Sequence, residues 1–193
     1  MGIGLYWQVH AARRKPGAPA FPAPLAASHA TPTDIAMMAR ALRLARKAGA
    51  AGEVPVGAVI YRTADGAVVG EGANTRERGR DPAGHAEFTA IMHAARAEKD
   101  WRLDHCTLVV TLEPCAMCAG AIVNARVGRV IYGAKDPKAG FAGSLGNLLM
   151  DTRLNHRALV IAGVREAACV KLLTDFFARL RVGKKALKSK ITP

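Results

Sequence analysis

The chain has 193 residues, of which 50% are hydrophobic, and this composition suits one globular domain and excludes a disordered protein. The formal net charge of +13 favours a polyanionic partner such as a nucleic acid, although a solvated basic tail that aids solubility would give the same balance. No apolar run approaches the roughly 20 residues of a membrane span, and no apolar core follows the basic residues 13–15 as in a secretory signal. A cytoplasmic protein is therefore expected.

The two ends of the chain are predicted to lie outside the folded domain. Residues 1–31 contain an Ala- and Pro-rich stretch at 16–24 without hydrophobic periodicity, which cannot bury enough surface to offset the entropy of ordering. We expect a disordered N-terminal tail over 1–31, a folded domain over 32–182 and a basic C-terminal tail over 183–193.

Helical and strand patterns alternate through the predicted domain. Thr33 is a candidate cap for a helix that ends near Gly49 and Gly52, and the β-rich runs 56–61 and 67–72 flank an Asp-Gly turn typical of a hairpin. The next segments are predicted as a helix over 82–98, a strand over 106–112, a helix over 115–124, strands over 127–132 and 158–162, and a helix over 165–181. This alternation indicates an α/β layered domain.

Two short motifs carry candidate metal ligands. His85-Ala86-Glu87 lies near the start of one predicted helix, and Cys115 and Cys118 share one face of the first turn of another. The dipole and free N–H groups of a helix start favour the thiolates that zinc requires. If the two helix starts meet, one imidazole and two thiolates can bind a single ion.

Three protein ligands leave one tetrahedral position open, which is typical of catalytic zinc and gives a water molecule that loses its proton near neutral pH. Glu87, two residues beyond the histidine, is a candidate proton shuttle from this water to the substrate.

Other interpretations of these cysteines stay open. A C-x-x-C pair can be a redox pair or half of a structural zinc site. A structural site would need a fourth ligand, and the candidates in this sequence are Cys106, His105, Cys169 and His156. The conjunction of H-A-E with P-C-x-x-C, 30 positions apart, favours the catalytic interpretation.

With these motifs the sequence resembles the cytidine/deoxycytidylate deaminase superfamily, and within it the bacterial tRNA-specific adenosine deaminases. The similarity covers about residues 33–182. It is carried by E-V-P-V-G-A-V at 53–59, Asn74 with Arg76, D-P-A-G-H-A-E at 81–87, T-L-E-P-C-A-M-C-A-G-A-I at 111–122 and Y-G-A-K-D-P-K-A-G at 132–140, with shorter matches at 143–145, 155–157 and 175–177. The sequence departs from the usual pattern at Ala83, Gly84, Phe88 and Phe141.

The resemblance implies a three-layer α/β/α fold with a central five-stranded mixed sheet and one zinc ion per subunit. It also implies a homodimer that holds the anticodon stem-loop of tRNA across both subunits and converts the wobble adenosine to inosine. Asn74 and the backbone N–H of Ala86 would bond the extruded base, and Val54 would form the pocket wall. By its residue type alone, Asn74 could also be a turn residue.

The resemblance also assigns residues to the RNA. Asp136 and Lys138 would lie on the loop that meets the anticodon, with Phe176 and Phe177 near it on the last helix. Either phenylalanine could instead belong to the core.

Two rival functions fit part of the pattern. A small-molecule deaminase of guanine, cytosine or a nucleoside would use the same zinc site, but it has no need for six basic residues from Arg179 to Lys190. A zinc-stabilised RNA-binding module without catalysis has no need for Glu87.

Overall fold

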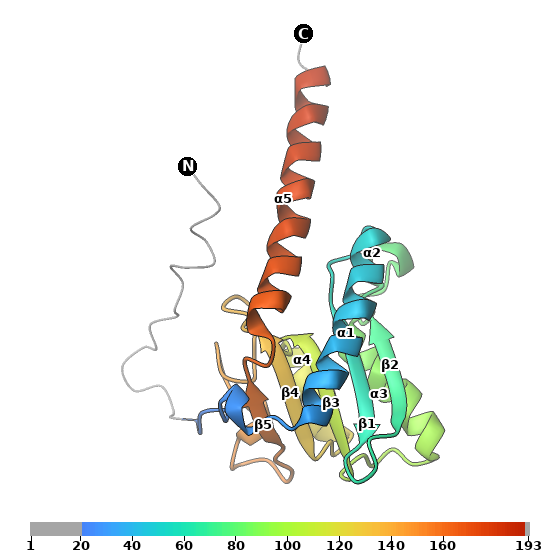
Figure 1. Cartoon of the computed structure of the whole chain (residues 1–193), viewed down its shortest axis with the longest axis vertical. Helices are drawn as coiled ribbons and strands as arrows, with labels where there is room; N and C mark the ends of the chain where they lie inside the picture. The colour runs from blue at the N-terminus through green and yellow to red at the C-terminus, as the bar shows by residue number, and fades with distance from the viewer. Residues whose placement is uncertain (1–20, 192–193) are drawn as a thin grey trace.

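A computed structural model describes residues 21–191, with side chains up to Val182 (Figure 1). Five strands form one sheet in the order β2-β1-β3-β4-β5. They are β1 (Gly57–Arg62), β2 (Val68–Ala73), β3 (Cys106–Leu112), β4 (Arg129–Ala134) and β5 (Leu159–Ala162). β1 pairs antiparallel with β2 and β3, whereas β3, β4 and β5 run parallel, so the predicted mixed five-stranded sheet is confirmed.

Helices cover both faces of the sheet. α3 (Ala86–Glu98) and α4 (Ala116–Asn124) pack against one face, which presents Ile60 and Val110. α1 (Pro32–Ala50) and the base of α5 (Glu166–Ile191) pack against the other face, which presents the alternate residues Val59 and Val109. The strands are apolar on both sides because each face is covered, and the predicted three-layer α/β/α architecture is confirmed.

The region before α3 differs from the prediction. The helix predicted over 82–98 is preceded by a separate short helix, α2 (Arg76–Gly79), and begins only at Ala86. Asp81 does not cap α3; its carboxylate accepts a hydrogen bond from the N–H of Ala83 at 2.8 Å within a turn. His85 takes the N-cap position of α3 in extended conformation.

The N-terminal segment also differs from the prediction over residues 21–31. Leu25 pairs with the free edge of β5 beside Ile161, donating its N–H to Val160 O at 2.8 Å and accepting from the N–H of Ala162 at 2.9 Å. Thr31 caps α1 in place of Thr33, through a capping box with Asp34. These contacts pair backbone groups on the edge of the sheet, which composition alone does not reveal. Residues 1–20 of the predicted tail lie outside the described residues.

At the other end, α5 continues to Ile191, so most of the predicted C-terminal tail is helical. Lysine, alanine and leucine favour a helix, and no proline interrupts the segment before Pro193. The helix projects well beyond the body of the domain (Figure 1). Between residues 21 and 191, no helix is both long and apolar enough to cross a membrane.

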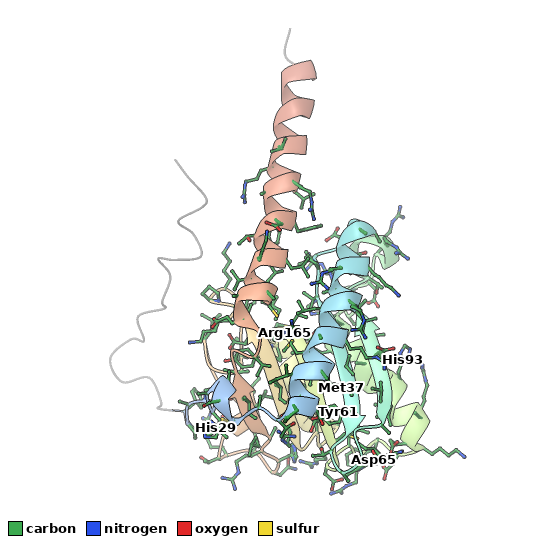
Figure 2. The ribbon with its side chains drawn as sticks, in the orientation of Figure 1. His29, Met37, Tyr61, Asp65, His93 and Arg165 are labelled. Atoms are coloured by element: carbon green, nitrogen blue, oxygen red, sulfur yellow. The ribbon has the colours of Figure 1, made fainter. Side chains whose placement is uncertain are left out.

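Two local features fix the layers relative to the sheet. A Cβ added at Gly72 of β2 would lie 2.0 Å from Ala86 O, so β2 and α3 pack backbone against backbone directly beside His85. On the opposite face, buried Asp34 accepts hydrogen bonds from Tyr61 (Figure 2) and from Arg129 at 3.0 Å, which ties the first turn of α1 to β1 and β4.

Candidate metal and catalytic site

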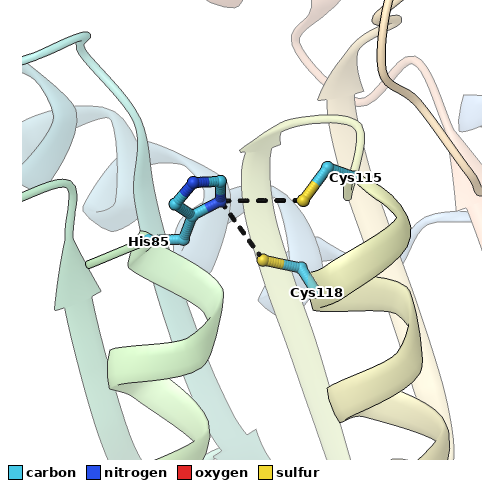
Figure 3. Close-up of side chains that lie close together, drawn as sticks. All are labelled: His85, Cys115 and Cys118. Atoms are coloured by element: carbon cyan, nitrogen blue, oxygen red, sulfur yellow. Dashed lines mark hydrogen bonds between the residues drawn. The ribbon is translucent and has the colours of Figure 1, made fainter. Parts of the chain in front are cut away.

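The predicted ligands converge where α3 and α4 begin (Figure 3). The Nδ1 atom of His85 lies 3.7 Å from the Sγ atom of Cys115 and 3.5 Å from that of Cys118. His85 and Cys115 are the N-cap residues of their helices, and Cys118 lies in the first turn of α4. The three ligand atoms all lie within 4.8 Å of one another, in the only such group among residues 21–182.

These distances fit a single tetrahedral zinc ion. Zn–S and Zn–N bonds of about 2.3 and 2.0–2.1 Å at a tetrahedral angle place nitrogen about 3.5 Å from each sulfur. The observed separations of 3.5 and 3.7 Å match this value. Two thiols and one imidazole are soft donors, and such a set favours zinc over harder cations.

Hydrogen bonds and burial shift the pKa values of the three ligand side chains. The hydrogen bond from Cys118 and the neighbouring His85 imidazole lower the pKa of Cys115 to about 4. The proton shared with Cys115, together with burial, raises the pKa of Cys118, and the hydrogen bond with Cys115 raises that of His85. These shifts favour negative charge on the Cys115 sulfur beside the imidazole, and a bound metal would displace the protons that remain on Cys118 and His85.

Glu87 is the second residue of α3, and it is 4% exposed. Burial raises the pKa of its carboxyl to about 7, and the negative Cys115 acts in the same direction. Its carboxylate lines the same pocket as His85 and Cys115. A group of this kind can both accept and donate a proton close to the metal position.

The pocket brings together only part of the predicted substrate-binding set. Val54, Asn74 and Asp136 line it, and Ala86 lies buried beside His85 at the start of α3. Lys138 is exposed on the adjacent loop and is not a lining residue of this pocket.

The two phenylalanines lie apart from the pocket. Phe176 is 5% exposed and lies close to Gly49 of α1, and its ring meets that of Phe177 edge to face at 5.4 Å. Phe177 is half-buried and packs on the core between α1 and α5. This placement favours the core interpretation of both residues.

Two buried carboxylates that support the pocket were missed by the sequence reasoning. Glu53 accepts hydrogen bonds from Asn74 Nδ2 at 3.5 Å and from the backbone N–H groups of Glu77 and Arg78 at 3.1 and 2.7 Å. Glu113 forms one side of the pocket at the end of β3. The available signal was an acidic residue next to apolar residues, Glu53 before Val54 and Glu113 after Leu112, where burial requires hydrogen-bond partners.

The alternative fourth ligands lie elsewhere. Cys106 and Cys169 are buried on opposite faces of the sheet, and burial raises the pKa of each thiol to about 11. His105 pairs with Glu98 at 2.8 Å, and His156 bonds Val127 O at 2.9 Å. Over residues 21–182 the geometry therefore supports an open site with three protein ligands.

Substitution of the ligands tests this assignment. His85→Ala, Cys115→Ser and Cys118→Ser should each abolish stoichiometric zinc binding, measured by elemental analysis of the purified protein, because each removes one of three ligands. The matched variants Cys106→Ser and Cys169→Ser should retain one zinc per chain. Loss of zinc from either control would contradict the open site.

Comparisons with known proteins agree with this geometry. Residues 31–134 match the cytidine and deoxycytidylate deaminase zinc-binding region. A tRNA-specific adenosine deaminase of Bacillus subtilis is 45% identical over 159 residues, which are 82% of this chain and 98% of that protein. One from Haemophilus influenzae is 44% identical over 156 residues, or 81% of this chain and 90% of that protein.

Solved structures of two kinds share the fold. One, from a study of A-to-I editing by tRNA:A34 deaminases at the wobble position, superposes with a TM-score of 0.68 at 39% identity and covers 72% of this chain and 99% of that chain. A guanine deaminase from Nitrosomonas europaea superposes with a TM-score of 0.65 at 25% identity, covering 84% and 89% of the two chains. The chain therefore belongs to the cytidine and deoxycytidylate deaminase family, with His85, Cys115 and Cys118 as the zinc-binding triad of that region.

Proposed function

We propose that this protein deaminates the wobble adenosine of tRNA to inosine. The observation that carries the proposal is the match at 45% identity to almost the whole length of a tRNA-specific adenosine deaminase, combined with the triad and with Glu87 in the pocket that His85 and Cys115 line. The Nitrosomonas europaea guanine deaminase of similar fold is 25% identical.

The reaction replaces the 6-amino group of adenine with oxygen from water and releases ammonia. His85, Cys115 and Cys118 would hold zinc, which when bound would act as a Lewis acid that lowers the pKa of water. Glu87 takes the proton from that water as the new C–O bond forms. It delivers this proton to the ring nitrogen, then takes the second proton from the new hydroxyl at C6 and passes it to the departing amine, so that the carboxylate is regenerated and no redox partner is needed.

Other residues of the pocket orient the base. Asn74 is 9% exposed, and Glu53 holds its amide by accepting from Nδ2, so the rest of the amide is available to the substrate. The N–H of Ala86 belongs to the start of α3, where the first N–H groups have no partner within the helix. Val54 and Leu112 give the pocket apolar walls suited to a planar ring.

The proposed RNA surface lies along α1 and α5. Arg43, Arg46 and Lys47 are exposed on α1, and Arg179 and Arg181 are exposed where α5 leaves the body of the domain. These helices cover the same face of the sheet, so their charges add to one positive field. A phosphate backbone suits such a surface, whereas a free base carries no charge that would use it.

The zinc-stabilised module without catalysis fits the site less well. Glu87 is buried beside two thiols at a cost in desolvation, and a structural zinc site gains nothing from an additional carboxylate next to its ligands.

The substrate class and the role of Glu87 can be tested together. Wild-type protein should form inosine from total tRNA and release ammonia, with no comparable turnover of guanine, cytosine or free nucleosides. Glu87→Ala should retain zinc and tRNA binding but lose at least the ~10²–10⁴ in rate typical of a general acid–base group. Turnover of guanine with unmodified tRNA would favour the rival enzyme, and near-normal turnover by Glu87→Ala would refute the assigned role.

Truncation after Leu180 tests the basic helix. The cut removes five basic residues and leaves the zinc ligands intact, so it should raise the Kd or KM for tRNA without loss of zinc. Each lost phosphate contact should also flatten the salt dependence of binding by roughly 0.9 in log–log slope on duplex or 0.7 on single strands.

A full-length control separates charge from length. Replacement of the same five residues, Arg181, Lys184, Lys185, Lys188 and Lys190, by glutamine preserves a strong helix former at each position. It should flatten the salt dependence as the truncation does. Unchanged affinity and slope in both variants would mean that this end is only a solvated basic segment.

The proposal includes a homodimer through α4. This helix contains no charged residue, and its outer face exposes Ala116, Met117, Asn124 and the open space at Gly120. An apolar, small-residue helix face beside the active site suits a second copy of the chain.

Substitution at this face tests the dimer. A Cβ at Gly120 meets no atom within 4 Å in the single chain, so Gly120→Glu should fold normally but dissociate a dimer in analytical ultracentrifugation. Leu159→Glu, at another exposed apolar position, is the matched control and should leave the mass unchanged. A wild-type monomer at micromolar concentration would rule out the proposed assembly.

A further inference from the structure

One carboxylate at the edge of the pocket accepts four hydrogen bonds. Glu113 follows β3 and is only 2% exposed. Its Oε1 accepts from the N–H groups of Ala142 at 3.1 Å and Ser144 at 2.9 Å. Its Oε2 accepts from the N–H of Asp136 at 2.9 Å and from the hydroxyl of Ser144. Both oxygens of one buried side chain thus satisfy donors from both ends of a single loop.

That loop covers residues 135–147 and lacks helix or strand structure. Its backbone lies directly on the carboxylate, because a Cβ added at Gly140 would be 2.4 Å from the Glu113 carboxyl carbon. One further bond runs from the N–H of Phe141 to Pro114 O at 2.8 Å. Buried N–H groups without partners are costly, so the loop depends on Glu113 for its conformation.

The same loop forms a wall of the pocket. Asp136 and Ala139 line it opposite Asn74 and Arg76. The Asp136 side chain accepts from the N–H groups of Lys138 and Ala139 at 2.9 and 3.2 Å, which folds the tip of the loop around it. Glu113 therefore sets the position of the residues that the substrate would meet.

Glu113 also precedes the zinc ligand Cys115 by two residues, with only Pro114 between them. The loop anchor and the metal ligand thus belong to one short segment at the end of β3, next to the bridge that pairs Cys115 with Gly140. If the loop moves relative to Glu113, it therefore also moves relative to the zinc ligand Cys115.

We propose that Glu113 is a positioning residue that holds the 135–147 loop in place relative to the zinc site and thereby sets the affinity of the protein for its RNA substrate. The inference deepens the proposed function and rests on it for the identity of the substrate. Glu113 acts through the loop, and the chemical step belongs to Glu87.

Glutamine at this position distinguishes positioning from space filling. Its amide has nearly the same shape but offers one acceptor oxygen and one donor NH₂ group. Whichever way the amide turns, an NH₂ group faces either the N–H of Asp136 or the N–H pair of Ala142 and Ser144. Part of the loop therefore loses its anchor although no volume changes.

The test compares Glu113→Gln and Ser144→Ala with Glu98→Gln, which alters a half-buried carboxylate paired with Arg62 and His105. Glu113→Gln should retain full zinc content, raise the KM for tRNA about tenfold or more and leave kcat within about threefold. Ser144→Ala should change KM in the same direction but less, and it serves if the glutamine variant does not fold. Glu98→Gln should behave as wild type in each measurement.

Amide hydrogen exchange gives a readout that needs no substrate. Exchange at Asp136, Ala142 and Ser144 should become faster in Glu113→Gln and stay unchanged in Glu98→Gln. Unchanged KM and exchange in both test variants, or joint loss of zinc and kcat, would overturn the positioning role. If wild-type protein makes no inosine in tRNA, the proposed function fails, while the exchange data still decide whether Glu113 holds the loop.

Discussion

The site depends on the start of two helices at neighbouring positions along one sheet. α3 and α4 cover the same face, and each begins with a ligand as its N-cap, His85 in one and Cys115 in the other. This approach is possible because β2 carries Gly72 where the backbone of α3 lies against it. Two helix starts pointing at one spot also concentrate unpaired N–H groups and positive dipole ends there, which favours a thiolate. The metal position is thus a consequence of how the layers pack.

The walls of the pocket, in contrast, consist of irregular backbone held by buried carboxylates. Glu53 supports the wall that carries Asn74 and α2, and Glu113 supports the opposite wall that carries Asp136. A carboxylate can accept several N–H groups at once, which replaces the regular pairing that a helix or strand would provide. Such walls can change without a change in the sheet, so that one zinc site on one fold can serve different substrates.

The elements with strong periodicity and the ligands with short spacing could be predicted from the sequence. The sheet, its helices and the triad follow from local patterns, whereas two features that local patterns do not decide depend on contacts distant in sequence. Leu25 pairs with the open edge of β5, and Phe176 is buried where α5 packs on α1. Of the departures from the family pattern, Gly84 lies where a Cβ would be 3.0 Å from Thr75 Oγ1, and Phe141 is partly buried and packs against the core.

The central claim is an open zinc site with two sulfur ligands and one nitrogen ligand from this chain. X-ray absorption spectroscopy at the zinc edge of the full-length, metal-loaded protein measures this directly. The account predicts two sulfur neighbours at about 2.3 Å and two lighter atoms at about 2.0–2.1 Å, one from His85 and one from solvent. A first coordination shell with three or four sulfurs would contradict it, because Cys106 or Cys169 would then have to leave the core and close the site.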